Sequence, residues 1–292
     1  MPLKDMRRRD FVGGLAAAGV AASQLQAQAP PLKGRLKQCC MRTNFDPKMP
    51  FEDMCREAAA RGIVGFDLIG PNDWPTLKKY GLAPSMANTG GVTFEQGVIR
   101  KELHEALEKS VGANLDQCAA AGVANMICVG GQRRGMSYEE GMDAAVAFFN
   151  RVKKHAEDKN VTICLEMMNS KFTDATLGRV DQICDHLDWG FEVMRRVNSP
   201  RVKLLFDIYH AQVADGNVVQ RIKDNFALIG HFHTGGVPGR HELDETQELN
   251  YRFIAKTIAD LGYTGYIAHE YRPSPGKDPL KSLEQCVGIM TV

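Results

Sequence analysis

Short apolar segments alternate along the chain with longer segments of helical period, and this happens eight times in succession. The apolar segments, which we expect to be strands, are residues 36–41, 63–68, 82–87, 125–130, 161–167, 201–207, 227–233 and 263–270. The expected helices are residues 50–61, 76–80, 96–121, 137–158, 186–197, 216–225, 248–261 and 279–288. Strands that alternate with helices of this length form a parallel sheet, and eight such units close most simply into a (β/α)8, or TIM, barrel. Flavodoxin-like and Rossmann sheets ordinarily have fewer strands, so the sequence predicts a single α/β barrel domain.

The expected helix boundaries carry residues that commonly occur there. Ser137 is followed three residues later by Glu140, which is the pattern of a capping box at the start of a helix. Gly62, Gly122 and Gly262 stand between an expected helix and the next strand, where a left-handed residue commonly ends a helix. These signals support the assigned order of helices and strands.

Residues 1–29 have the composition of an export signal rather than of a barrel element. Arg8 and Arg9, followed by Phe11, resemble the twin-arginine signal and precede a stretch of small and apolar residues. That stretch is about a dozen residues long, whereas a membrane-spanning helix needs about 20. We therefore expect the twin-arginine machinery to export the protein to the periplasm or another exported location, with no stable membrane anchor.

The body that remains after removal of this leader, residues 30–292, is close to neutral. The whole chain has a formal net charge of +1 and the leader contains four basic and two acidic residues, so the body is at −1. Such a surface offers no electrostatic attraction for nucleic acid. Cleavage is expected after Ala29, at an A-x-A site, although Pro30 is an unfavourable residue for a signal peptidase.

The chain contains eight cysteines, which in an exported protein raise the question of disulfides. Cys39, Cys128 and Cys164 occur within apolar runs, where a thiol usually packs as a small hydrophobic group. A protein that folds before export does so in the reducing cytosol, so its folding does not depend on disulfides. The sequence has no C-x-x-C spacing, which argues against a cysteine zinc site.

Four consecutive expected strands end with a residue that can bind a metal ion. They are Glu166, Asp207, His233 and Glu270. Each residue alone fits a cap or a loop hydrogen-bond acceptor equally well, but active sites of such barrels lie at the C-terminal ends of the strands. Three carboxylates on one rim would repel one another unless a cation neutralised them. Oxygen-rich ligands with one imidazole suit a single divalent Mn2+, Mg2+ or Co2+ ion, with Zn2+ less favoured.

Three further histidines lie close to these positions. His231 and His233 share a face of one strand, and only the residue nearer the strand end reaches the rim, so we expect His231 to be a core residue or to support the ligand. His210 lies just beyond the sixth expected strand and is expected to contact substrate rather than metal. His269 should point away from the face of the ligand that follows it, and we expect it to be structural.

Five segments of the sequence resemble those of one family. They are LIGPNDWPTLKKYGL (68–82), CLEMMNS (164–170), LLFDIYH (204–210), GHFHTGGVPGRHELD (230–244) and LGYTGYIAHEY (261–271). Together they look like the hydroxypyruvate isomerase-like branch of the xylose isomerase-like barrel superfamily, over essentially the whole chain after the leader. His233 is a departure, because hydroxypyruvate isomerases often carry glutamine there, and histidine is closer to the ketose 3-epimerases.

The resemblance implies roles for individual residues. A single divalent metal ion would have four protein ligands, namely Glu166, Asp207, His233 and Glu270. The two glutamates among them would double as acid and base. His210 and Arg240 would touch substrate oxygens. Trp74 would either form the floor of the pocket against a sugar face or simply pack in the core.

These features predict an isomerase or epimerase of a small hydroxy-carbonyl compound, such as a sugar, a keto-sugar or a hydroxypyruvate-like acid. A metal on the carbonyl and the adjacent hydroxyl would acidify the intervening C–H and stabilise the enediolate. One carboxylate would remove the proton and one would return it. Return to the same carbon inverts it, whereas return to the neighbouring carbon isomerises the compound, and the sequence does not choose between them.

Three alternative functions were compared with this prediction: a lyase, a phosphodiesterase and a non-catalytic binding protein. A metal-dependent lyase acting on an oxidised sugar would use the same enediolate. An endonuclease IV-like phosphodiesterase shares the architecture, but it needs a multi-metal, histidine-rich centre and a basic surface. A non-catalytic periplasmic sugar-binding protein usually has two lobes, for which this chain is too short. The expected partner is therefore a small carbohydrate-like substrate rather than nucleic acid, and the sequence is compatible with a homo-oligomer.

Overall fold

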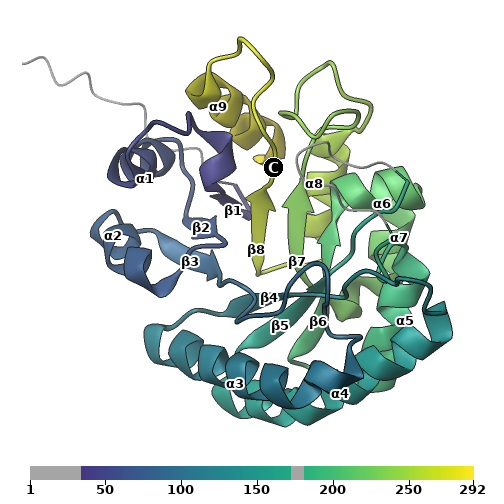
Figure 1. Cartoon of the computed structure of the whole chain (residues 1–292). Helices are drawn as coiled ribbons and strands as arrows, with labels where there is room; N and C mark the ends of the chain where they lie inside the picture. The colour runs from purple at the N-terminus through teal and green to yellow at the C-terminus, as the bar shows by residue number, and fades with distance from the viewer. Residues whose placement is uncertain (1–33, 172–180) are drawn as a thin grey trace, which may run out of the picture.

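Eight parallel strands form one sheet within residues 34–171 and 181–292, the parts of the chain that the computed structural model describes (Figure 1). In chain order they are β1 Lys37–Cys40, β2 Gly65–Asp67, β3 Ala83–Met86, β4 Asn125–Val129, β5 Thr162–Glu166, β6 Val202–Asp207, β7 Ile229–Thr234 and β8 Tyr266–His269. Neighbours in the sheet follow the order β3-β2-β1-β8-β7-β6-β5-β4. The first and last strands therefore lie side by side, as the closure of a barrel requires.

Ala87, directly after β3, joins the two ends of this order. Its N–H donates to Asn125 O at 2.9 Å, and its carbonyl accepts a hydrogen bond from Ile127 N at 3.1 Å. The sheet is thus nearly closed into a ring, which confirms the predicted (β/α)8 barrel. Each predicted strand overlaps an observed one.

Helices surround the barrel on its outer side (Figure 1). In the described residues they are α1 Phe51–Ala60, α2 Trp74–Lys79, α3 His104–Ala121, α4 Tyr138–Lys159, α5 Leu187–Val197, α6 Ile208–Ala214, α7 Val218–Asn225, α8 Tyr251–Asp260 and α9 Pro279–Met290. Short 3-10 turns occur at Arg42–Asn44, Pro71–Asp73, Lys101–Leu103 and Phe226–Leu228. Each of the expected helices has a counterpart in this set.

One expected helix, 96–121, begins later than predicted, with an α-helix only from His104. The preceding residues bind the rim of the barrel instead, where Ile99 N donates to Gly130 O at 3.3 Å. Gly97 has a φ of +59°, and a Cβ there would lie 1.8 Å from Gly130 O. The two backbones approach each other too closely for any side chain at position 97, and helical period does not reveal such a contact between distant residues.

Other segments also differ from the prediction, and α8 and β8 each begin three residues later than expected. The short helix α6 was not expected, and it starts directly at the end of β6 because the carboxylate of Asp207 caps it, accepting a hydrogen bond from His210 N at 3.1 Å. The predicted strand 227–233 begins two residues later, because the 3-10 turn Phe226–Leu228 occupies its start.

The boundary signals read from the sequence are confirmed. Ser137 Oγ accepts the N–H of Glu140 at 3.2 Å, and Glu140 Oε2 accepts the N–H of Ser137 at 3.0 Å, which completes the capping box at the start of α4. Gly62, Gly122 and Gly262 have φ values of +82°, +73° and +79°.

Apolar side chains fill the barrel beneath its C-terminal rim. Met86, Ile127, Cys164 and Leu205, from four neighbouring strands, form a buried cluster inside the sheet. A much larger cluster joins the outer face of the sheet to the helices. All eight cysteines lie in the described residues and are buried free thiols, which agrees with their predicted packing role.

The predicted leader, residues 1–29, lies outside the described residues. Among the helices of residues 34–171 and 181–292, none combines the length and the apolar composition that a bilayer crossing requires.

Candidate metal centre

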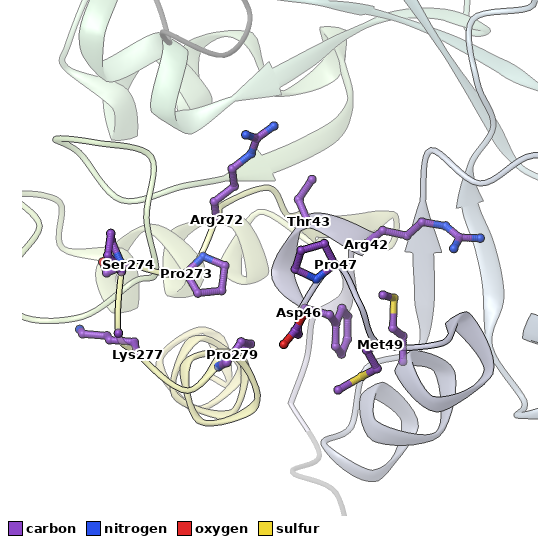
Figure 2. A pocket seen from close by; sticks show the side chains of 14 residues that line it. Arg42, Thr43, Asp46, Pro47, Met49, Arg272, Pro273, Ser274, Lys277 and Pro279 are labelled. Carbon is purple, nitrogen blue, oxygen red and sulfur yellow. The ribbon is translucent and has the colours of Figure 1, made fainter.

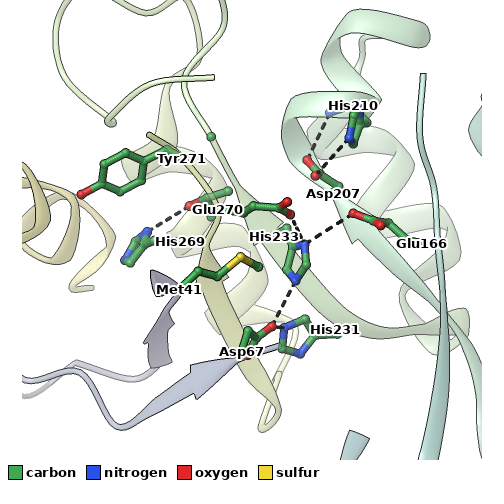
Figure 3. Close-up of polar contacts among 12 residues, drawn as sticks. Met41, Asp67, Glu166, Asp207, His210, His231, His233, His269, Glu270 and Tyr271 are labelled. Atoms are coloured by element: carbon green, nitrogen blue, oxygen red, sulfur yellow. Dashed lines mark hydrogen bonds and ion pairs between the residues drawn. The ribbon is translucent and has the colours of Figure 1, made fainter. Parts of the chain in front are cut away.

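Four side chains converge at the C-terminal ends of β5, β6, β7 and β8 (Figure 3). They are Glu166, Asp207, His233 and Glu270, and one potential ligand atom of each lies within 4.8 Å of the others. Three of the residues are buried and Glu270 is partly exposed. Parallel strands of a barrel end at a common rim, so the structure brings together the four residues that the sequence pattern singled out.

The closest contact in this cluster is a short ion pair between an imidazole nitrogen and a carboxylate oxygen. His233 Nδ1 lies 2.5 Å from Glu270 Oε2 and 3.7 Å from Glu166 Oε1. Both His233 Nδ1 and Glu270 Oε2 are buried, and neither has a hydrogen-bond partner within the described residues. Buried polar atoms without partners are rare and commonly mark a functional site or an ion. A divalent cation coordinated by these atoms would satisfy both, so the residues present fit a metal ion.

The charge of the cluster also favours a bound cation. Burial opposes protonation of His233, but Glu270, Asp67 and Glu166 outweigh burial and raise the pKa of His233 well above its ordinary value. A site that draws a proton onto a buried imidazole has an excess of negative charge. Such a site favours a bound cation.

Asp67, the last residue of β2, supports His233 from the other side and was missed in the sequence. Asp67 Oδ2 accepts hydrogen bonds from His231 Nε2 at 2.7 Å and His233 Nε2 at 3.1 Å, and Asp67 Oδ1 accepts one from the Ser85 hydroxyl. Burial opposes ionisation of Asp67, but the two histidines outweigh it and hold its pKa well below the usual range. A weaker signal was present, because Asp67 is a carboxylate near the end of the expected strand 63–68.

Arg240 lies between two carboxylates of the cluster. Its Nη2 is 2.9 Å from Asp207 Oδ2 and 2.8 Å from Glu270 Oε1. Burial opposes ionisation of Glu270, but Arg240 and His233 lower its pKa to about 2, so Glu270 is ionised at neutral pH. At Asp207 burial wins over Arg240, and the pKa is raised. Arg240 is thus part of the cluster itself.

His210, the third residue of α6, also faces this site. Its Nδ1 lies 2.7 Å from Asn169 Nδ2, and its Nε2 is 3.6 Å from Asp207 Oδ2. Burial, together with Arg240, lowers the pKa of His210 to about 3, so the ring is neutral. Its Nε2 is buried and has no hydrogen-bond partner in the described part of the chain. Asn169 is the second residue at this site that sequence reasoning missed.

The other singled-out residues lie outside the ligand cluster. His231 is buried on Asp67, as expected for a core or supporting residue. His269 bonds Thr234 Oγ1 at 2.9 Å and Gln38 Oε1 at 3.0 Å, which is a structural role. Trp74 Nε1 donates to a backbone carbonyl at 2.9 Å, and its ring packs against two apolar clusters, so its observed contacts are those of core packing.

A cavity of about 770 Å³ opens between the loops that follow β1 and β8 (Figure 2). Apolar side chains such as Phe45 and Met49 line it together with three basic residues, Arg42, Arg272 and Lys277. Both loops leave C-terminal strand ends, so the cavity is on the same side of the barrel as the metal-ligand cluster. Arg42 pairs with Asp73, and Lys277 pairs with Glu242 and Asp244, so carboxylates already neutralise two of these three cations.

The fold and the cluster define a class of protein, a (β/α)8 barrel with acidic and histidine side chains gathered at its C-terminal rim. Within that class, the chain belongs to the xylose isomerase-like TIM barrel family, because residues 76–286 match the family profile. This confirms the family resemblance expected from the sequence.

Several named relatives are similar to parts of this sequence. A Xenopus laevis protein whose name proposes a hydroxypyruvate isomerase is 42% identical over 81 residues, which are 28% of this chain and 30% of the relative. A 2-oxo-tetronate isomerase of Cupriavidus necator is 36% identical over 122 residues, 41% of this chain and 44% of that protein. The matched segments thus span less than half of these two relatives. A 2-oxo-tetronate isomerase of Pectobacterium atrosepticum is 28% identical over 77% of this chain and 87% of its own length.

Solved structures show the same fold. A family 2 AP endonuclease from Brucella melitensis superposes with a TM-score of 0.73 at 22% identity, covering 85% of this chain and 96% of that one. A 3-keto-D-glucoside 4-epimerase from E. coli gives 0.71 at 18% identity, covering 87% and 98%. At these identities the likeness establishes the barrel and no more.

Proposed function

We propose that the protein is an isomerase or epimerase that moves a proton between carbons of a small hydroxy-carbonyl compound. In this proposal one divalent metal ion has four protein ligands, Glu166, Asp207, His233 and Glu270. The observation that carries it is the contact of His233 Nδ1 with Glu270 Oε2, two buried atoms without hydrogen-bond partners among the described residues, inside a cluster of three carboxylates. The names of the isomerase relatives support the reaction class.

The metal ion, when bound, supplies a Lewis acid that polarises the substrate carbonyl. The proton itself is moved by the chain. Glu166 extends from β5 and Glu270 follows β8, on either side of His233 from β7, so a substrate seated above His233 has one glutamate at each flank. One carboxylate removes the proton from carbon to give the enediolate, and the other returns a proton. Ionised Glu270 is suited to accept one.

Two further side chains hold the substrate oxygens. His210 is neutral and presents its buried Nε2 to the site. Arg240 keeps Glu270 ionised through Nη2 and has a second buried donor, Nε, without a hydrogen-bond partner in the residues that the structure describes. Both can therefore donate to substrate oxygens without breaking an existing bond. We assign Trp74 to packing, the second of its two expected roles.

The proposed substrate class is supported by the names of the relatives and by the residues that line the cavity. Hydroxypyruvate and 2-oxo-tetronate are small 2-oxo acids, and the cavity on the same side of the barrel as the cluster is lined by the basic side chain of Arg272, whereas its other two cations, Arg42 and Lys277, pair with carboxylates. We therefore propose that the substrate is a small sugar-derived oxo acid rather than a neutral keto-sugar. Return of the proton to the same or to the neighbouring carbon decides between epimerisation and isomerisation.

The metal and the location belong to the same proposal. Three carboxylates and one imidazole favour Mn2+, Mg2+ or Co2+, with Zn2+ less favoured. We propose export by the twin-arginine machinery, on the basis of Arg8, Arg9 and Phe11. The near-neutral body argues against an endonuclease, although the fold is shared with one.

The test is turnover of a panel of oxo acids and keto-sugars followed by proton NMR of the products. We expect a product of unchanged mass, loss of activity after chelation, and recovery with Mn2+, Co2+ or Mg2+. Loss of water or a carbon fragment from the substrate would identify the lyase instead. Full activity in protein shown by elemental analysis to be metal-free would overturn the metal assignment.

A further inference from the structure

The side chains of Asn169 and His210 form a buried pair beside the ligand cluster. Asn169 lies three residues beyond Glu166 at the end of β5, and His210 lies three residues beyond Asp207 at the end of β6. We infer that Asn169 is a positioning residue that fixes the tautomer of His210, so that Nε2 carries the proton and donates it in a hydrogen bond to a substrate oxygen. The substrate contact rests on the proposed function, whereas the tautomer does not.

The orientation of the Asn169 amide is determined by the backbone. Its Oδ1 accepts a hydrogen bond from Lys171 N at 3.1 Å. The nitrogen end of the amide therefore faces His210, with Nδ2 at 2.7 Å from Nδ1. The reverse orientation would place the amide nitrogen against the N–H of Lys171, which leaves two donors facing each other.

The tautomer of His210 follows from this orientation. An amide nitrogen has only hydrogens to offer, so His210 Nδ1 must be the acceptor and carry no proton. In a neutral imidazole the other nitrogen then bears the proton. His210 Nε2 is accordingly an N–H donor.

The position of this donor indicates what it serves. His210 is 4% exposed, and its Nε2 has no hydrogen-bond partner within residues 34–171 and 181–292. The carboxylate oxygen Asp207 Oδ2 is 3.6 Å away, too far for a hydrogen bond, and already accepts one from Arg240 Nη2 at 2.9 Å. A buried donor without a partner is unfavourable, so a substrate oxygen beside the ligand cluster is the group that would satisfy it.

The tautomer can be read directly by 15N NMR of protein labelled at histidine. A His210→Gln variant assigns the His210 signals among the eight histidines of the chain. Wild-type protein without substrate should show the proton on Nε2 and none on Nδ1. A proton on Nδ1 in the wild type would overturn the inference, because two donors, Asn169 Nδ2 and His210 Nδ1, would then face each other. This result stands even if no oxo acid is turned over, so it separates the inference from the proposed function.

Two variants test the role of Asn169 in turnover. Asn169→Asp replaces the donor by an acceptor, so a proton should move onto Nδ1 and kcat/KM should fall at least about 10-fold. Asn169→Leu removes the donor without adding charge, and both tautomers should then appear. Either variant suffices if the other fails to fold.

Asn114→Asp is the matched control. Asn114 lies on α3, and its amide donates a hydrogen bond to the backbone carbonyl of Asn88 at 2.8 Å. It should leave the His210 spectrum and the rate unchanged. Wild-type kcat/KM and an unchanged Nε2 proton in a folded Asn169→Leu protein would contradict the positioning role.

Discussion

His233 Nε2 donates a hydrogen bond to Asp67 Oδ2 at 3.1 Å, so Asp67 holds the ring from the side opposite to the carboxylate cluster. That bond keeps a proton on Nε2, so Nδ1, 2.5 Å from Glu270 Oε2, is the nitrogen that would give up its proton and bind a cation. Carboxylates that accept from the far nitrogen of a ligand histidine orient the ring and raise its basicity.

We predict that Asp67→Asn weakens binding of the divalent ion by about 10- to 100-fold, because the amide is a poorer acceptor for His233 Nε2. Calorimetric titration of the metal-stripped protein with Mn2+ measures this. Asp73→Asn is the control, since Asp73 forms an exposed ion pair with Arg42 at 2.8 Å, outside the cluster. Equal affinity of wild type and Asp67→Asn would show that Asp67 serves only the core.

A second prediction concerns the tie between the loops that follow β7 and β8. Lys277 Nζ is 3.0 Å from Glu242 Oε1 and also pairs with Asp244, while Ser274 N donates to Glu242 Oε2 at 2.8 Å. Burial opposes ionisation of both carboxylates, but hydrogen bonds from Ser274 and Lys277 lower the pKa of Glu242, and those from Lys277 and Thr246 lower the pKa of Asp244. Lys277→Met leaves these two buried charges without their cation.

The pH dependence of this tie has a definite sign. A carboxyl whose pKa is lowered on folding stabilises the protein above its ordinary pKa, and this contribution is lost as pH falls through the lowered value. Lys277→Met should therefore lower Tm at pH 7 by about 2 to 4 °C, with the difference shrinking below pH 4. Thermal unfolding across pH checks this, with Lys281→Met as an exposed control. A difference that grows on acidification would contradict it.

The third prediction concerns export. Replacing Arg8 and Arg9 by lysine should keep the protein in the cytosol, because the twin-arginine machinery reads the arginine pair. Cell fractionation with detection of the unprocessed chain measures the outcome. Arg195 and Arg196 are an exposed arginine pair on α5, and replacing both by lysine is the control. This change also exchanges two arginines for lysines but should leave export unaltered. Unaltered export of the leader variant would remove the proposal.

The sequence was sufficient to predict the barrel because each strand, and each helix other than α6, has a local pattern. It also predicted Glu166, Asp207, His233 and Glu270 as a group, since strand ends of a barrel share one rim whatever their separation in the chain. Asp67 obeys the same rule and was overlooked, because β2 is separated from the four consecutive strands β5 to β8.

Other features depend on contacts that no local pattern encodes. The link of Asn169 to His210 depends on the backbone N–H of Lys171, which turns the amide. The bridging position of Arg240 depends on the path of the loop after β7. Helix α6 is too short for its period to be recognised, although the sequence already placed Asp207, which caps it, at the end of the preceding strand.

The central claim is proton transfer by Glu166 and Glu270, and it is tested most directly by turnover in D2O. Wild-type enzyme should place deuterium on carbon in the product, provided that the carboxylate exchanges its proton with solvent before returning it. Glu166→Gln and Glu270→Gln keep the side-chain shape but remove the proton acceptor, so each should lower turnover by ~10² or more and abolish the carbon-bound deuterium. Wild-type rates with full deuterium incorporation in both variants would contradict the assignment, even if the metal remained bound.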